Sequence, residues 1–176
     1  AQRLVNNVKF ARKRWQRIHR LQGHIYLLEQ REEDAIENFT RSLTLGPADV
    51  GTVRQLSHLL TRRGDFHQAQ SVLNMSPPHA LLEEKATNLM RLQETEKALI
   101  AGANAVRREP NNPHKQMWFG RLLVQANRPV DADTPFRQAV RLASKDERTW
   151  LALIQYLTAV NRNDDAEKEL RNALEA

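Results

Sequence analysis

Residues 23–47 read GHIYLLEQREEDAIENFTRSLTLGP. Gly23 is followed three positions later by Tyr26, and residues at this spacing lie on one face of a helix. Ala35 and Phe39, four positions apart, share one face of a second helix in the same way. Charged residues separate the two patterns, and a Gly-Pro pair ends the second one. The stretch therefore predicts two short helices joined by a tight turn, with a small and a large residue on the packed face of each.

The alanine of this stretch recurs along the chain. Six alanines follow one another at separations of 34, 34, 29, 34 and 34 residues, namely Ala1, Ala35, Ala69, Ala98, Ala132 and Ala166. The residues four positions after them are mostly large: Val5, Phe39, Leu73, Gly102, Phe136 and Leu170. The residues twelve positions before each of the last five alanines are mostly small: Gly23, Ser57, Ala86, Gly120 and Ile154. Self-similarity at this period predicts a stack of helix pairs, in which each unit contacts its neighbours and the stack offers an extended binding surface.

The pattern resembles that of the tetratricopeptide-repeat (TPR) family. The matching residues are Gly23, Tyr26, Ala35, Phe39 and Pro47, then Gly120, Leu123, Ala132, Phe136 and Ala139, then Trp150, Leu153, Leu157, Ala166 and Ala173. The resemblance implies an all-α fold, a right-handed superhelical solenoid of antiparallel helix pairs. It also implies a single array over residues 1–176. That array comprises a half-repeat helix at 1–15 followed by five repeats at 16–49, 50–78, 79–112, 113–146 and 147–176.

Three departures from the pattern carry expectations of their own. Pro77 and Pro78 should shorten the second helix of the second repeat, because proline cannot continue a helix. Gly102 stands where a large side chain is expected, and it should cost both helix propensity and packing. Pro135 falls within the second helix of the fourth repeat, so that helix either starts late, near Asp131 or Asp133, or kinks.

The positive charge is concentrated near the N-terminus. The chain has a formal net charge of +6. Residues 1–28 contain no acid, and their basic residues are Arg3, Lys9, Arg12, Lys13, Arg14, Arg17 and Arg20. A basic run of this kind suits either a nucleic-acid contact or the solvated face of a helix whose apolar residues pack inward. The solvated face is the interpretation we favour.

Composition excludes several classes of site. The chain has no cysteine, which excludes disulfides, thiolate catalysis and cysteine-bound zinc. It also lacks an apolar run of about 18 residues, the length expected of a membrane-spanning helix. With no signal segment visible either, the cytoplasm is slightly favoured as the compartment.

No motif for catalysis stands out. A glycine-rich phosphate loop, a His-Glu-x-x-His pair and a Gly-x-Ser-x-Gly elbow are all missing from the sequence. His24 and His58 occupy equivalent places in successive repeats, but two imidazoles without further ligands make a poor metal site. We therefore expect no enzyme activity, no cofactor and no bound metal.

Acidic residues gather where the second helices should begin. They are Glu32, Glu33 and Asp34, then Asp131 and Asp133, then Asp164 and Asp165. Carboxylates in a first helical turn complement the helix dipole and can cap free N–H groups. This structural role explains them without acid–base catalysis.

The resemblance also implies where a partner binds. In TPR proteins the first helices line the concave face, and matching that face by register selects Arg17, Arg20, His24, Arg54, His58, Arg62, Arg91, Met117, Trp118, Arg121, Val124, Arg148 and Leu151. Arginines predominate in the earlier repeats, and apolar residues join them in the later ones. The implied function is a non-catalytic protein–protein interaction scaffold that binds an acidic, partly hydrophobic peptide.

The best-known TPR site, a clamp for the C-terminal carboxylate of chaperones, is not expected. Its lysine and asparagine positions carry Arg20 with His24, then Gln55, then Ala80 with Glu84, and Glu84 has the wrong charge. Two alternatives stay open at this point, a nucleic-acid-binding helical repeat and a regulatory repeat array of a larger enzyme. The last apolar stripe has no capping helix after it, which predicts either a longer parent protein or self-association through an uncapped end: Ala166, Leu170, Ala173 and Leu174.

Overall fold

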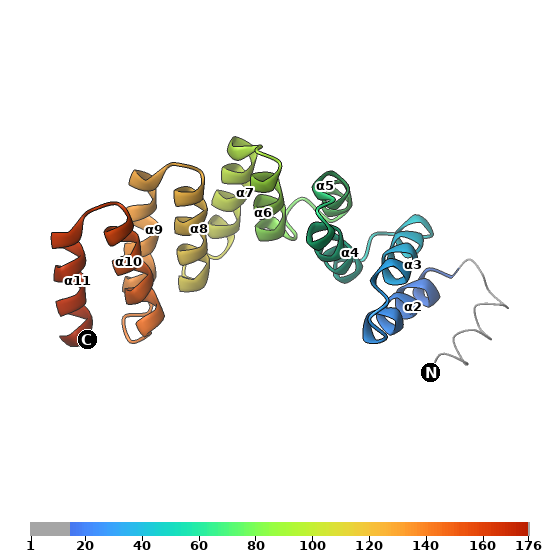
Figure 1. Cartoon of the computed structure of the whole chain (residues 1–176), viewed down its shortest axis with the longest axis horizontal. Helices are drawn as coiled ribbons and strands as arrows, with labels where there is room; N and C mark the ends of the chain where they lie inside the picture. Colours follow the sequence, from blue (N-terminus) through green and yellow to red (C-terminus); the bar gives the residue numbers. More distant parts are fainter. Residues whose placement is uncertain (1–14, 176) are drawn as a thin grey trace. The chain divides into compact units, whose positions relative to one another are not determined.

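The computed structural model describes residues 15–175, and all their regular structure is helical (Figure 1). The ten helices of this part of the chain are α2 (Gln16–Leu28), α3 (Glu32–Thr44), α4 (Val50–Arg63), α5 (Phe66–Asn74), α6 (Leu82–Arg91), α7 (Thr95–Arg108), α8 (Pro113–Gln125), α9 (Pro129–Leu142), α10 (Glu147–Ala159) and α11 (Asn163–Glu175). The prediction of an all-α fold is therefore confirmed. The predicted half-repeat helix, residues 1–15, lies outside the described residues except for Trp15.

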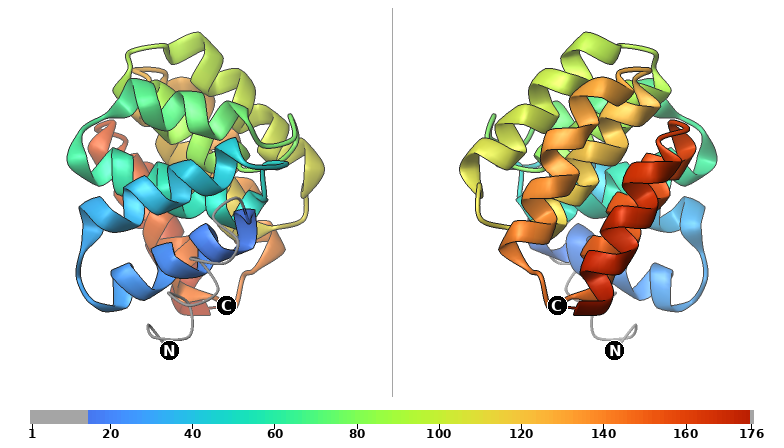
Figure 2. Two further views of the ribbon diagram at one scale, coloured as in Figure 1. Left: turned by 90° about the vertical axis from the view of Figure 1, so that its right-hand side faces the viewer. Right: turned by 90° about the vertical axis from the view of Figure 1, so that its left-hand side faces the viewer.

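The helices follow one another as antiparallel pairs. Each predicted repeat range contains two of them, and the members of the pairs α2/α3, α4/α5, α8/α9 and α10/α11 pack against each other. The gold α8 and orange α9 lie side by side in the right-hand view of Figure 2. No described helix combines the length and the apolar character needed to cross a lipid bilayer.

The chain divides into two compact units. The first unit comprises Ala1–Leu92, whose described helices are α2 to α6, and the second comprises Gln93–Ala176, with α7 to α11. The division falls inside the predicted 79–112 repeat, between its two helices.

The turn inside each helix pair contains one residue in the left-handed conformation. These residues have φ between 59° and 88° and repeat at 34, 29, 34 and 34 positions: Gln30, Gly64, Gln93, Asn127 and Asn161. In the first of these turns, the Arg31 N–H donates to the Tyr26 carbonyl at 2.8 Å, and the turns after α4, α8 and α10 make the equivalent bond. Such a bond closes the end of a helix on a left-handed residue. The backbone thus carries the same period as the alanines.

In the first unit, the core forms where a glycine meets an aromatic ring. A Cβ on Gly23 would lie 2.6 Å from Cε1 of Phe39, so only glycine leaves room for this buried ring. The alanines of the repeat, Ala35 and Ala69, are fully buried here. The cluster of buried apolar residues around Phe39 extends through α4 to Leu81 before α6.

The second unit repeats this arrangement with Gly120 and Phe136. A Cβ on Gly120 would lie 2.8 Å from Cε2 of Phe136, whose ring stacks on Tyr156 at 4.9 Å between centroids. Gly102 does not leave the packing defect that the sequence predicts. A Cβ there would meet Leu122 at 2.6 Å and Phe119 at 2.9 Å, because these α8 side chains fill the space.

The prolines act as expected in one repeat and differently in the other. α5 has nine residues and ends at Asn74, ahead of Pro77 and Pro78, as predicted. α9 begins at Pro129 and continues through Pro135, so of the two alternatives predicted for this helix, a late start or a kink, the late start is wrong. Proline is favourable at a first helical position, where no N–H is needed, and Pro129 takes that place.

Candidate functional site

The first helices of the first unit form a cleft. It lies between α2 and α4, has a volume of about 610 Å³, and is lined by Arg17, Arg20, Leu21, His24, Asp49, Gly51 and Gln55. Arg17, Leu21 and His24 are four and three positions apart and so project from one face of α2. Leu21 is 52% exposed, so it adds apolar surface to the wall of the cleft.

Asp49 shapes the charge of this cleft. Its Oδ2 accepts hydrogen bonds from the Thr52 N–H at 2.9 Å and the Thr52 hydroxyl at 2.8 Å, which caps the start of α4. These bonds, and then the charge of Arg20 at 3.3 Å, lower the pKa of Asp49 below its usual value. Arg20 is thus partly neutralised, whereas Arg17 is exposed and forms no ion pair with any described residue.

Other predicted arginines of the first unit are engaged elsewhere. Arg54 Nε lies 2.8 Å from Glu84 Oε1, which links α4 to α6. Arg62 Nη2 lies 3.0 Å from Glu32 Oε1 at the start of α3, and the Arg91 guanidinium lies 5.5 Å from the ring centre of Phe66. Arg62 and Arg91 therefore turn toward second helices, which corrects their assignment to the first-helix surface. Arg62 lies in the last turn of α4 and Arg91 in the last turn of α6, so their side chains can reach the first residues of α3 and α5.

The histidines do not form a metal site. The His24 ring packs edge-on against Phe39, with 5.1 Å between ring centroids, and His58 is exposed on α4 outside the cleft. Among residues 15–175 no group of three or more His, Cys, Asp or Glu side chains is placed to hold a metal ion.

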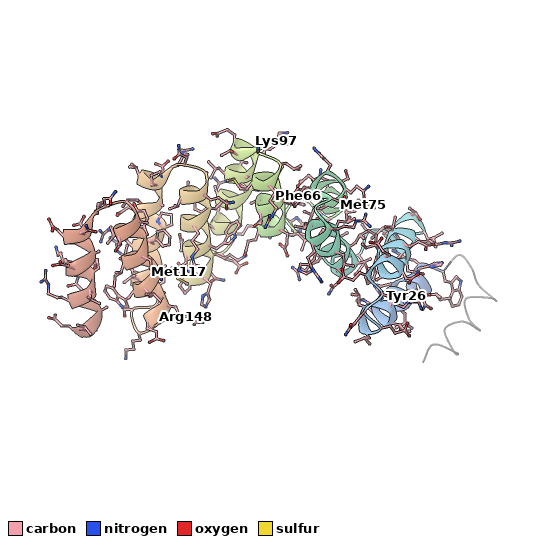
Figure 3. The ribbon with its side chains drawn as sticks, in the orientation of Figure 1. Tyr26, Phe66, Met75, Lys97, Met117 and Arg148 are labelled. Carbon is pink, nitrogen blue, oxygen red and sulfur yellow. The ribbon has the colours of Figure 1, made fainter. Side chains whose placement is uncertain are left out.

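The predicted residues of the second unit fall into three kinds. Met117 is only 6% exposed and belongs to the core, so its assignment as a contact residue is corrected. Arg148 is paired with Asp146, the N-cap residue of its own helix. Its Nε lies 2.9 Å from Oδ1 and its Nη2 lies 2.8 Å from Oδ2 of this carboxylate. Met117 and Arg148 are labelled in Figure 3. The accessible ones are Arg121, Val124 and Leu151, with Trp118 half-buried.

Arg148 also determines the ionisation of Asp146. Hydrogen bonds from the Arg148 side chain, and then from its backbone N–H, lower the pKa of Asp146 to about 2. Asp146 is the N-cap residue of α10 and remains a carboxylate at neutral pH.

The acids near the second-helix starts lie in the first helical turns of α3, α9 and α11, where they complement the helix dipole, but the capping that the sequence predicts for them is not seen among the described residues. The N-cap residues of α3, α5, α7 and α9 form no side-chain cap bond, whereas Asp49, Asn112 and Asp146 cap the first helices α4, α8 and α10. The acids instead bind arginines, in pairs that include Arg31–Asp34, Arg63–Glu33, Arg128–Asp131, Arg162–Asp165 and Arg162–Asp133.

Several of these ion pairs recur at fixed spacings in the sequence, although the spacing alone does not show which side chains pair. Arginine stands three positions before aspartate at each of three turns, and Arg63 follows Glu33 by 30 positions, close to one repeat. Acids at the starts of the second helices form ion pairs with arginines of neighbouring elements. The number of arginines on the first-helix surface therefore overstates its free positive charge.

Comparison with known proteins identifies the fold. No family model matches the sequence, and no curated protein matches it. Among solved structures, the chain is similar to MamA (residue 41 to the end) from Desulfovibrio magneticus RS-1, at 16% identity and a TM-score of 0.72, over 91% of this chain and 93% of that one. It is also similar to YrrB, described as a TPR protein with an unusual peptide-binding site, at 13% identity and a TM-score of 0.72, over 97% of this chain and 91% of that one.

A third similar structure is the C-terminal part of a TPR repeat-containing protein from Cytophaga hutchinsonii. It is 14% identical, with a TM-score of 0.75, over 92% of this chain and 69% of that one. Together these similarities confirm that the chain has a TPR-like fold.

Proposed function

We propose that this chain is a non-catalytic protein–protein interaction scaffold and that the cleft between α2 and α4 binds an acidic, partly hydrophobic peptide. The observation that carries the proposal is the composition of the cleft, in which the exposed Leu21 lies between Arg17 and His24 on one face of α2. The TPR-like fold supports the scaffold role, because stacked helix pairs present extended surfaces to partners.

The apolar part of the peptide packs on Leu21. Burying an exposed leucine against an aliphatic partner side chain removes apolar surface from water on both sides of the contact. On the opposite wall Gly51 has no side chain, and among the described residues the side-chain atom near its missing Cβ is Asp49 Oδ2, at 3.3 Å. The peptide backbone can therefore approach α4 at this point, where the Gln55 amide offers both a donor and an acceptor.

The acidic part of the peptide binds the arginines of α2. A guanidinium presents donors in a fork that matches a carboxylate, and Arg17 has this group free of any described ion-pair partner. Arg20 contacts Asp49 through Nη1, so a peptide carboxylate there competes with Asp49 or uses the remaining donors. Arg17 is therefore the principal electrostatic contact, and Arg20 a secondary one.

The accessible residues of α8 and α10 form a second candidate contact surface with the same combination of groups. Arg121 is exposed and unpaired within the described chain, and Val124 and Leu151 are exposed apolar side chains. We include them in the proposal as a separate contact surface of the second unit.

Calorimetric titration with a short capped peptide, two leucines flanked by glutamates, tests the proposal. Arg17→Glu should weaken binding at least about tenfold, because it replaces an attractive charge by a repulsive one. Arg41→Glu makes the same charge change on an exposed residue of α3 outside the cleft, and it should leave affinity unchanged.

A second variant separates the apolar contact from the charge. Leu21→Ala should weaken binding while leaving the dependence on salt concentration as in the parent chain, since no charge is removed. Equal affinity in the parent, Arg17→Glu and Leu21→Ala chains would contradict the proposal. So would tight, steeply salt-dependent binding of single-stranded RNA in place of the peptide, which would favour a nucleic-acid-binding repeat.

A further inference from the structure

A second groove lies in the second unit, among α7, α8 and α9. Its volume is about 680 Å³, and its apolar lining includes Ile100 and Ala103 of α7, Phe119 of α8 and Pro135 of α9. All its lining residues fall between Glu96 and Gln138, so the groove belongs to the second unit alone. None of the residues predicted to bind a partner lines it.

Two departures from the repeat pattern contribute to this groove. Gly102 occupies the place where other second helices insert a large side chain such as Phe39 or Phe136. Because Gly102 has no side chain, Phe119 of α8 comes within 2.9 Å of its missing Cβ and forms part of the groove lining. Pro135, within α9, lines the other side.

The groove keeps a large aliphatic side chain in contact with water. Ile100 is 62% exposed at its edge, although the next residue along the lining, Leu99, is buried. Ile100 thus adds apolar surface to the rim of an apolar hollow, the kind of concave site in which ligands usually bind.

The polar groups of the groove select the charge of a partner. Glu96 is exposed and forms no ion pair within the described chain, whereas Arg128 is held by Asp131 at 2.7 Å. Among the described ionisable side chains of the lining, the one left free is therefore a carboxylate.

We propose that this groove binds a basic amphipathic segment of a partner protein, with aliphatic side chains against Ile100 and Phe119 and a lysine or arginine at Glu96. A segment with aliphatic residues at helical spacing presents several of them to a groove at once, and its basic residues complement the free carboxylate of Glu96. The cleft between α2 and α4 and this groove then differ in charge preference. This inference does not depend on the cleft between α2 and α4.

A synthetic capped peptide with leucines at positions i, i+4 and i+7 and lysines elsewhere serves as the probe. Calorimetry should detect binding to the complete chain, and Glu96→Lys and Ile100→Gln should each weaken it at least about tenfold. Glu147→Lys is the matched charge control, because Glu147 also lies exposed in a first helical turn, that of α10. Leu170→Gln is the matched apolar control on α11.

Three results would overturn the proposal. One is undiminished binding in both groove variants, and another is equal affinity for a peptide with glutamate in place of lysine. The third is a concentration-dependent dimer of the chain that Ile100→Gln dissociates, because the groove would then be occupied by a second copy. The Arg17→Glu chain should bind the lysine peptide as the parent does, so failure at one site is distinguishable from failure at the other.

Discussion

The absence of a Cβ atom at Gly23 determines how the first repeat packs. Its missing Cβ would lie within 2.9 Å of three ring atoms of Phe39, and this ring is fully buried and cannot move aside. Gly23→Ala should therefore destabilise the chain by about 1–2 kcal/mol, because overpacking outweighs the gain of up to about 1 kcal/mol in helix propensity. Urea denaturation followed by circular dichroism measures this change.

Gly51→Ala is the control for that substitution. Gly51 is also helical, but it is exposed, and among the described residues the side chain near its missing Cβ is that of Asp49. Alanine there should leave stability unchanged or raise it slightly. Equal effects of the two substitutions would show that the Phe39 contact does not determine the cost.

At the scale of elements, the start of α10 depends on the ionised Asp146. Its pKa is lowered to about 2 from a reference value of 3.8 by the side chain and then the backbone N–H of Arg148. The stabilisation that this carboxylate provides is therefore complete above the reference pKa and is lost as the pH falls through about 2. Arg148→Ala should raise the pKa of Asp146 but keep it below 3.8, because the N–H of residue 148 still donates.

Carboxyl-detected NMR titration of Asp146 in both chains measures these pKa values. A pKa of Asp146 that does not change on Arg148→Ala would contradict the assignment of the shift to the guanidinium. It would also return Arg148 to the residues available for a partner.

The helices themselves were largely predictable from the sequence, since small and large residues recur at helical spacing. The shortening of α5 also followed from Pro77 and Pro78, because proline supplies no N–H. The helix α9 was harder to predict. Pro129 is favourable at its first position, and the buried side chains of Ala132 and Phe136 hold the segment around Pro135 in helical form. Packing thus outweighed the tendency of Pro135 to interrupt the helix.

The candidate sites were less predictable than the helices, because side-chain pairing is not visible in a repeat pattern. Register placed Arg17, Arg20 and His24 together on the first-helix surface, and these three residues line the cleft between α2 and α4. It could not show that Glu32 binds Arg62, since that requires the neighbouring helices in three dimensions. The groove among α7, α8 and α9 was missed as well, although Gly102 and Pro135 were its signals in the sequence.

At the scale of the molecule, the chain is a TPR-like array with two compact units, with the cleft between α2 and α4 in the first and the groove among α7, α8 and α9 in the second. The two surfaces differ in charge because their free groups differ. A guanidinium is unpaired in the first and a carboxylate in the second. Extended repeat surfaces suit such a division, since each repeat contacts only its neighbours and can change without the others.

The central claim is that the cleft between α2 and α4 binds an acidic, partly hydrophobic peptide. Amide chemical-shift mapping of the complete labelled chain, titrated with the leucine–glutamate peptide, tests it most directly. We predict that the largest shifts fall on the residues of the cleft, above all Arg17, Leu21 and Gly51, and that Arg17→Glu removes them. Shifts confined to other helices, or no saturable shift at all, would contradict the account.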